Sequence, residues 1–140
     1  MRVSRFLMAA GLAVLIGVSS LAMVSAQAKT DEDYDKLMKA VGAANGAMRA
    51  AAKEQNAAGV TTEAGKMVAL FKDAQAFWTA RNNAEAAEWA GAAMKHADAL
   101  AKATDMGAAM GAMKELGATC MTCHTKYREK TETGFAIKKG

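Results

Sequence analysis

The sequence predicts an all-α fold, an antiparallel up-down-up-down four-helix bundle that forms one domain. The 140 residues include no proline, which would interrupt a helix, and alanine makes up much of the 52% hydrophobic content. Apolar residues recur at spacings of three and four in four stretches that short breaks separate. The 18 basic and 14 acidic residues are mixed in sign, so the composition excludes disorder and gives no indication of nucleic-acid binding.

The first segment has the features of a secretory signal peptide. Arg2 and Arg5 precede an apolar run over residues 6–24, and small residues follow that run. A positively charged start, an apolar stretch and a small-x-small exit are the three parts of such a signal. A retained membrane anchor is the alternative, because the apolar run is almost long enough to span a bilayer.

We therefore predict a signal peptide over residues 1–28, cleaved after Ala26 or Ala28, and a domain over residues 29–140. Cleavage leaves 16 basic against 14 acidic residues, a nearly neutral polypeptide without stable membrane insertion. Such a protein works outside the cytoplasm, and a bacterial periplasm is the expected location.

We expect the first helix to run from Asp31 to about Gln55. Leu37, Val41 and Met48 follow the helical spacing on one face. The acidic residues of the first turns suit the positive end of the helix dipole. A short segment with asparagine and glycine then ends the helix.

The second and third helices are separated by the Arg-Asn-Asn break at residues 81–83. The second is expected to open at residues 61–63, and its large apolar residues are Met67, Leu70, Phe71, Phe77 and Trp78. The third carries Trp89, Met94, Ala97 and Leu100.

The fourth helix is expected to follow a cap at Thr104 or Asp105 and to run to about Lys130. The tail over residues 131–140 is expected to be irregular. A bundle with so many alanines and glycines and so few large aliphatic residues has a thin core, and it is marginally stable unless another group fills its centre. This deficit is the first indication of a cofactor.

Residues 120–124 read Cys-Met-Thr-Cys-His, the C-x-x-C-H attachment signature of c-type haem. On a helix, positions i, i+3 and i+4 share one face, so both sulfurs and the imidazole point the same way. The thiols of Cys120 and Cys123 can add to the haem vinyl groups, while His124 ligates the iron from the proximal side. The motif therefore predicts one covalently attached haem c.

Other interpretations of the two cysteines fit less well. A thioredoxin-like C-x-x-C follows a strand, and the sequence predicts no strand here. A zinc site needs a fourth ligand, and His96 is the only other histidine. A disulfide between positions i and i+3 of one helix is strained.

A second axial ligand has to come from upstream of the motif, because neither methionine nor histidine occurs among the 16 residues after His124. In an up-down-up-down bundle the start of the first helix lies beside the end of the fourth. Met38 and His124 then both lie roughly 10 Å from the same end, whereas Met48 lies deeper. Met38 is the predicted distal ligand.

The sequence resembles the class II cytochromes c, the family that includes cytochrome c′ and the low-spin cytochrome c-556 type. The run from Cys120 to Arg128 matches the C-x-x-C-H-x-x-aromatic-Arg ending of that family, and residues 87–90 (Ala-Glu-Trp-Ala) match its tryptophan. The Leu-Met-Lys of residues 37–39 resembles the segment in which low-spin members place their axial methionine. The resemblance implies a four-helix bundle with the haem motif near its C-terminus.

Large side chains gather at the predicted haem end. We expect them to wall the haem pocket, lined by Leu37, Val41, Tyr34, Phe77, Trp78, Trp89 and Tyr127. A basic cluster at the same end can pair with haem propionates or guide an acidic redox partner. Its members are Lys126, Arg128, Lys130, Lys138 and Lys139. His96 is expected to be a surface or hydrogen-bonded histidine.

These observations predict an exported mono-haem c-type cytochrome that carries single electrons between redox proteins of the periplasm. The alternative is a five-coordinate haem protein of the cytochrome c′ kind, which binds nitric oxide or carbon monoxide. A third interpretation is a helical thiol-redox or zinc protein. No acid–base pair accompanies the motif, so the sequence does not favour an enzyme. The sequence also leaves open whether the protein forms a homodimer.

Overall fold

The computed structural model describes residues 30–138, so the predicted signal peptide lies outside the described residues. Four helices make up most of this part: α1 (Asp31–Lys53), α2 (Ala57–Ala80), α3 (Ala84–Ala101) and α4 (Met106–Tyr127). Two short strands follow, β1 (Arg128–Thr131) and β2 (Gly134–Ile137). The prediction of a mostly helical, bundle-like domain is confirmed. Among residues 30–138, none of the helices combines the length and apolarity needed to cross a bilayer.

Each helix begins at a polar residue that accepts hydrogen bonds from its first turn. Thr30 and Asp33 form a capping box at the start of α1. Asp105 caps α4, as the sequence indicates. The predicted start of α2 is wrong by four residues, because Asn56 caps it and accepts the Gly59 N–H at 2.9 Å. 

The predicted end of α4 and the predicted irregular tail are also wrong. The helix ends at Tyr127, and residues 128–137 form an antiparallel hairpin in which Lys130 pairs with Phe135. The Arg128 guanidinium lies 4.2 Å from the centre of the Phe135 ring on the same face. Gly134 has a φ of 154°, a backbone conformation that favours glycine, and so permits the tight turn.

The core is thin, as the composition predicts. Many of its buried positions are alanines, and the largest fully buried side chains are Phe77, Met48, Met67, Leu100, Leu116 and Val60. No polar or charged residue of the described part is buried. The interior therefore offers few large groups to hold the helices together.

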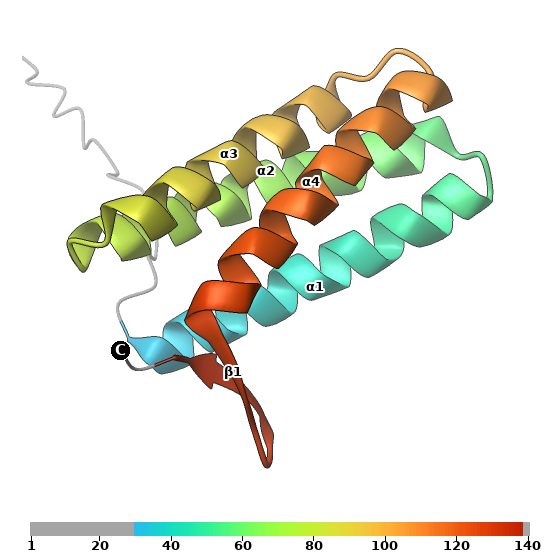
Figure 1. Ribbon diagram of the computed structural model, residues 1–140. Helices are drawn as coiled ribbons and strands as arrows, with labels where there is room; N and C mark the ends of the chain where they lie inside the picture. The colour runs from blue at the N-terminus through green and yellow to red at the C-terminus, as the bar shows by residue number, and fades with distance from the viewer. Residues whose placement is uncertain (1–29, 139–140) are drawn as a thin grey trace, which may run out of the picture.

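Helix α4 is the least embedded of the four. It contributes two buried residues, Ala109 and Leu116, to the described core. Close packing joins α1 to α2, α2 to α3 and α3 to α4, whereas α1 and α4 make little direct contact. Figure 1 shows α4 inclined to α1, with the two axes diverging toward the turns that precede α4 and follow α1.

We predict that Leu116→Ala lowers the free energy of unfolding by about 2–5 kcal/mol, because Leu116 is 2% exposed and is the larger of the two buried residues of α4. Urea unfolding followed by circular dichroism measures this change. Met121→Ala, at a side chain 61% exposed on the same helix, is the control and should stay within about 0.5 kcal/mol. Equal effects of the two substitutions would contradict this description of α4.

Candidate functional site

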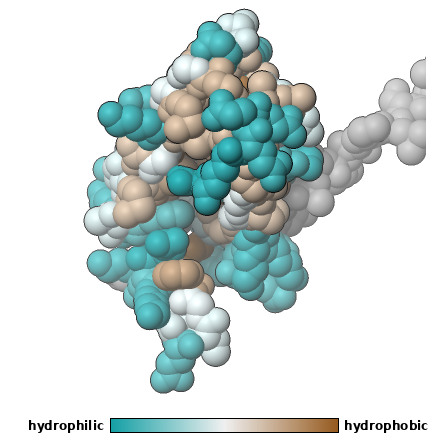
Figure 2. Space-filling view, turned by 90° about the vertical axis from the view of Figure 1, so that its right-hand side faces the viewer, coloured by the Kyte–Doolittle hydropathy of each residue, from teal (hydrophilic) through white to brown (hydrophobic). Residues whose placement is uncertain are grey.

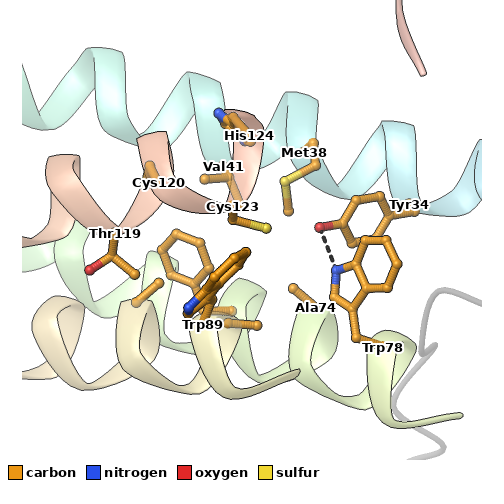
Figure 3. A pocket seen from close by; sticks show the side chains of 13 residues that line it. Tyr34, Met38, Val41, Ala74, Trp78, Trp89, Thr119, Cys120, Cys123 and His124 are labelled. Atoms are coloured by element: carbon orange, nitrogen blue, oxygen red, sulfur yellow. Dashed lines mark hydrogen bonds between the residues drawn. The ribbon is translucent and has the colours of Figure 1, made fainter. Parts of the chain in front are cut away.

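A small apolar cavity of about 40 Å³ lies where all four helices contribute side chains (Figure 3). Helix α1 provides three residues at helical spacing, and α2, α3 and α4 close the other sides. The lining consists of Tyr34, Met38, Val41, Phe71, Ala74, Trp78, Trp89, Ala90, Ala93, Thr119, Cys120, Cys123 and His124. Among the lining side chains, nitrogen or oxygen atoms occur only in Tyr34, Trp78, Trp89, Thr119 and His124.

The structure brings the C-x-x-C-H motif and Met38 to the same cavity. Cys120, Cys123 and His124 lie in the second half of α4, where the helix continues through the motif without interruption. Met38 extends toward the cavity from α1, and the Cys123 sulfur extends toward it from α4 (Figure 3). The sequence-based placement of Met38 near the motif therefore agrees with this geometry.

The other residues considered as axial ligands lie elsewhere. Met48 is fully buried in the core cluster that includes Leu100 and Leu116, and it does not line the cavity. His96 is half-buried on α3 and also lies outside the lining. Met38 is thus the one candidate distal ligand that shares the cavity with His124.

Burial sets the protonation of the motif. It raises the pKa of Cys120, and it raises that of Cys123 to about 11, with the charges of Cys120 and Glu85 adding to the effect. Both thiols therefore stay protonated at neutral pH. Burial also lowers the pKa of His124, as does the Arg128 charge, so the imidazole is neutral at pH 7 and has a lone pair free for a metal.

Aromatic side chains form one wall of the cavity. The Trp78 Nε1–H donates to the Tyr34 hydroxyl at 2.9 Å, and the Tyr34 ring stacks on Phe77 with centroids 4.3 Å apart. Tyr127 lies 5.3 Å from Trp78 and 5.7 Å from Trp89 between ring centroids. The structure thus brings together the aromatic residues that the sequence places at this end, and they contact one another in stacked and tilted pairs.

A polar cluster joins the end of α4 to the start of α3. The Tyr127 hydroxyl donates to Glu85 Oε2 at 2.6 Å and lies within hydrogen-bond distance of Asn83 Oδ1, at 3.2 Å. Lys126 pairs with the same Glu85 carboxylate. Lys126, predicted to belong to an exposed basic cluster, is therefore paired with an acidic neighbour.

The structure places the predicted pocket residues Leu37, Val41, Trp89, Tyr127 and Arg128 in three different positions. Val41 and Trp89 line the cavity, whereas Leu37 and Tyr127 pack in the aromatic cluster behind it. Arg128 is exposed and lies over Phe135 in the hairpin, outside the lining.

Sequence reasoning missed several residues of this region. Ala74 and Phe71 line the cavity one and two turns before Trp78, respectively, a helical spacing that could have identified them. Nothing in the sequence indicated that Glu85 and Asn83 would contact Tyr127, apart from their position at the start of a helix.

No family model matches the chain, and neither a curated protein nor a solved structure matches it. Residues 30–138 contain no group of three or more His, Cys, Asp or Glu side chains that could hold a metal ion.

We predict that Tyr34 ionises with a pKa of about 12, because burial of its hydroxyl disfavours the negatively charged form. An unfolded tyrosine has a pKa near 10, so the stabilisation due to neutral Tyr34 is complete below pH 10 and is lost as the pH rises toward 12. Ultraviolet absorbance of tyrosinate and urea unfolding between pH 9 and about 12 measure the two effects.

The control is Tyr34→Phe, in which the late absorbance transition and its share of the pH-dependent loss of stability should be absent. The same variant leaves the buried Trp78 N–H without its acceptor, which lowers stability at pH 7 by about 1–3 kcal/mol. A tyrosinate signal that is complete near pH 10 in the unmodified protein would contradict the burial of this hydroxyl.

Proposed function

We propose that this protein is an exported mono-haem c-type cytochrome that carries single electrons. Cys120 and Cys123 would hold the haem c through thioether bonds, and His124 and Met38 would ligate the iron. The observation that carries the proposal is the shared cavity: all three functional residues of the C-x-x-C-H motif line it together with Met38 from another helix. The haem supplies the one-electron redox chemistry when bound.

The chemistry of the donors supports this assignment over a thiol-redox protein. Redox-active cysteines have a lowered pKa, because the thiolate is the nucleophile. Here burial raises the pKa of both thiols, whereas it favours the neutral imidazole that an iron ligand requires. The Met38 thioether is neutral as well. The four side chains Met38, Cys120, Cys123 and His124 therefore bring no charge to the pocket at pH 7.

The surroundings of the cavity suit an electron carrier. Val41, Phe71 and Trp89 present apolar surfaces, and the stacked Tyr34 and Trp78 close one side. These side chains exclude water and fix the environment of the bound group, which is one means by which a protein sets a reduction potential. The motif lies in the last turns of α4, near one end of the domain, where a redox partner can approach.

We also propose that the protein is a class II cytochrome c and that its four helices follow an up-down-up-down order. Short turns at residues 54–56, 81–83 and 102–105 support that order. A cavity of about 40 Å³ is far smaller than a porphyrin ring, so a bound haem would require the helices around the cavity to separate. Helix α4 buries few residues and makes little contact with α1, which supports a separation between these two helices rather than between α4 and α3.

A gas-binding protein of the cytochrome c′ kind is the second candidate. The apolar lining favours it, because a neutral diatomic ligand needs an apolar space beside the iron. The two functions differ in whether the Met38 sulfur occupies the sixth coordination position.

We further propose export to a bacterial periplasm, on the evidence of the sequence pattern in residues 1–28. The partners would be redox proteins of that compartment, without nucleic acid and without stable membrane insertion after cleavage. A homodimer is compatible with this function.

We predict that Met38→Leu converts a low-spin oxidised protein into a high-spin one and abolishes the sulfur-to-iron charge-transfer absorbance at long wavelength. The reduction potential should fall, because a thioether favours ferrous iron, and carbon monoxide should bind rapidly to the reduced form. Visible absorbance, redox titration and stopped-flow mixing with carbon monoxide measure these changes.

Met48→Leu is the matched control, since Met48 is buried in the core away from the cavity and leucine has a similar volume. It should leave the spectrum unchanged. An unmodified protein that is high-spin, and that Met38→Leu does not alter, would overturn the electron-carrier ligation and support the gas-binding alternative.

A further inference from the structure

Three methionines follow one another along the first half of α4, at the opposite end of that helix from the C-x-x-C-H motif. Met106, Met110 and Met113 occupy positions i, i+4 and i+7. At 3.6 residues per turn they lie within about 60° of one another around the helix axis, over a length of about 10 Å. Their backbone positions are therefore neighbours on one side of the helix.

The three methionine side chains differ in burial, and the middle one is accessible to solvent. Met110 is 54% exposed, one of three large hydrophobic residues of the described part with high exposure. Met106 and Met113 are half-buried and pack against the core cluster that contains Met48 and Leu116. Figure 2 looks at the end of the bundle where α4 begins, and apolar side chains reach the surface there between hydrophilic ones.

The residues between the methionines place no large side chain beside them. They are all small: Gly107, Ala108, Ala109, Gly111 and Ala112. A Cβ atom placed on Gly111 would meet no other atom within 4 Å. Methionine has three rotatable side-chain bonds, so rotamer changes of Met106 and Met113 would be the means of bringing their sulfurs toward Met110.

The chemistry of this group selects one class of ligand. Thioether sulfur is a soft, neutral donor, which favours Cu(I) over Zn²⁺, Mg²⁺ or Ca²⁺. The nearest acidic residue in sequence, Asp105, caps α4 by accepting the Ala108 N–H at 2.8 Å. The side chains of Lys114 and Glu115 follow the group, so no charged residue stands between its members.

We propose that Met106, Met110 and Met113 form a binding site for a soft monovalent cation, Cu(I). The site is independent of the proposed haem function, since none of its residues lines the cavity of Met38 and His124. Thioethers carry no proton near neutral pH, so the affinity is the same at pH 5 and pH 7, unlike that of a thiol or imidazole site.

Ag(I) is the probe, because it shares the softness of Cu(I) and does not change oxidation state. It is titrated into the full chain labelled with ¹³C at the methionine methyl groups, with any free thiols blocked beforehand by N-ethylmaleimide. We expect the methyl resonances of Met106, Met110 and Met113 to shift together and to saturate at one equivalent. Met110→Leu should weaken binding by about tenfold or more, because one of three ligands is lost.

Met121→Leu is the matched control, as Met121 is 61% exposed on the same helix but lies outside the group. It should leave the affinity unchanged, and circular dichroism should show that both variants keep their helices. Three results would each overturn the proposal: no methionine shift, binding of equal strength in Met110→Leu, or equal shifts at Met121. The methionines would then serve for packing alone.

Discussion

The position of the last turns of α4 is the constraint on which the candidate site depends. This helix carries the C-x-x-C-H motif but buries few side chains of its own. Its end is held instead by Tyr127, whose hydroxyl bonds Glu85 at the start of α3 and whose ring lies beside Trp78 of α2. The paired Lys126 adds a second link to the same carboxylate. These contacts keep His124 and both cysteines at the cavity, while the rest of α4 packs against α3 and buries only Ala109 and Leu116.

That arrangement explains why a thin core and a chemically specific site occur together. The cavity takes side chains from every helix, so a group that filled it would join all four and compensate for the scarcity of large aliphatic residues. In the proposed function, the sparse contact of α1 with α4 would let such a group enter, and the packed Tyr34, Phe77 and Trp78 would bound it.

The sequence was sufficient for the helical fold and for the placement of Met38 near the motif, because both follow from a periodicity of 3.6 residues and the order of the helices. It was insufficient for the hairpin after Tyr127, whose strands have only four residues each and the first of which is mostly charged. The hydrogen bond from Trp78 to Tyr34 and the pairing of Lys126 with Glu85 join residues more than 40 positions apart. Contacts of that range depend on packing, which no local pattern encodes.

The covalent attachment of haem is the central claim, and the intact mass of the protein tests it most directly. The full chain is produced together with a c-type cytochrome maturation system, purified and denatured, and its mass and its absorbance in alkaline pyridine are recorded. We predict a polypeptide heavier by one haem, with a c-type absorbance that acid–acetone extraction does not remove. A polypeptide of unmodified mass, in which both Cys120 and Cys123 react with a thiol reagent, would contradict the account.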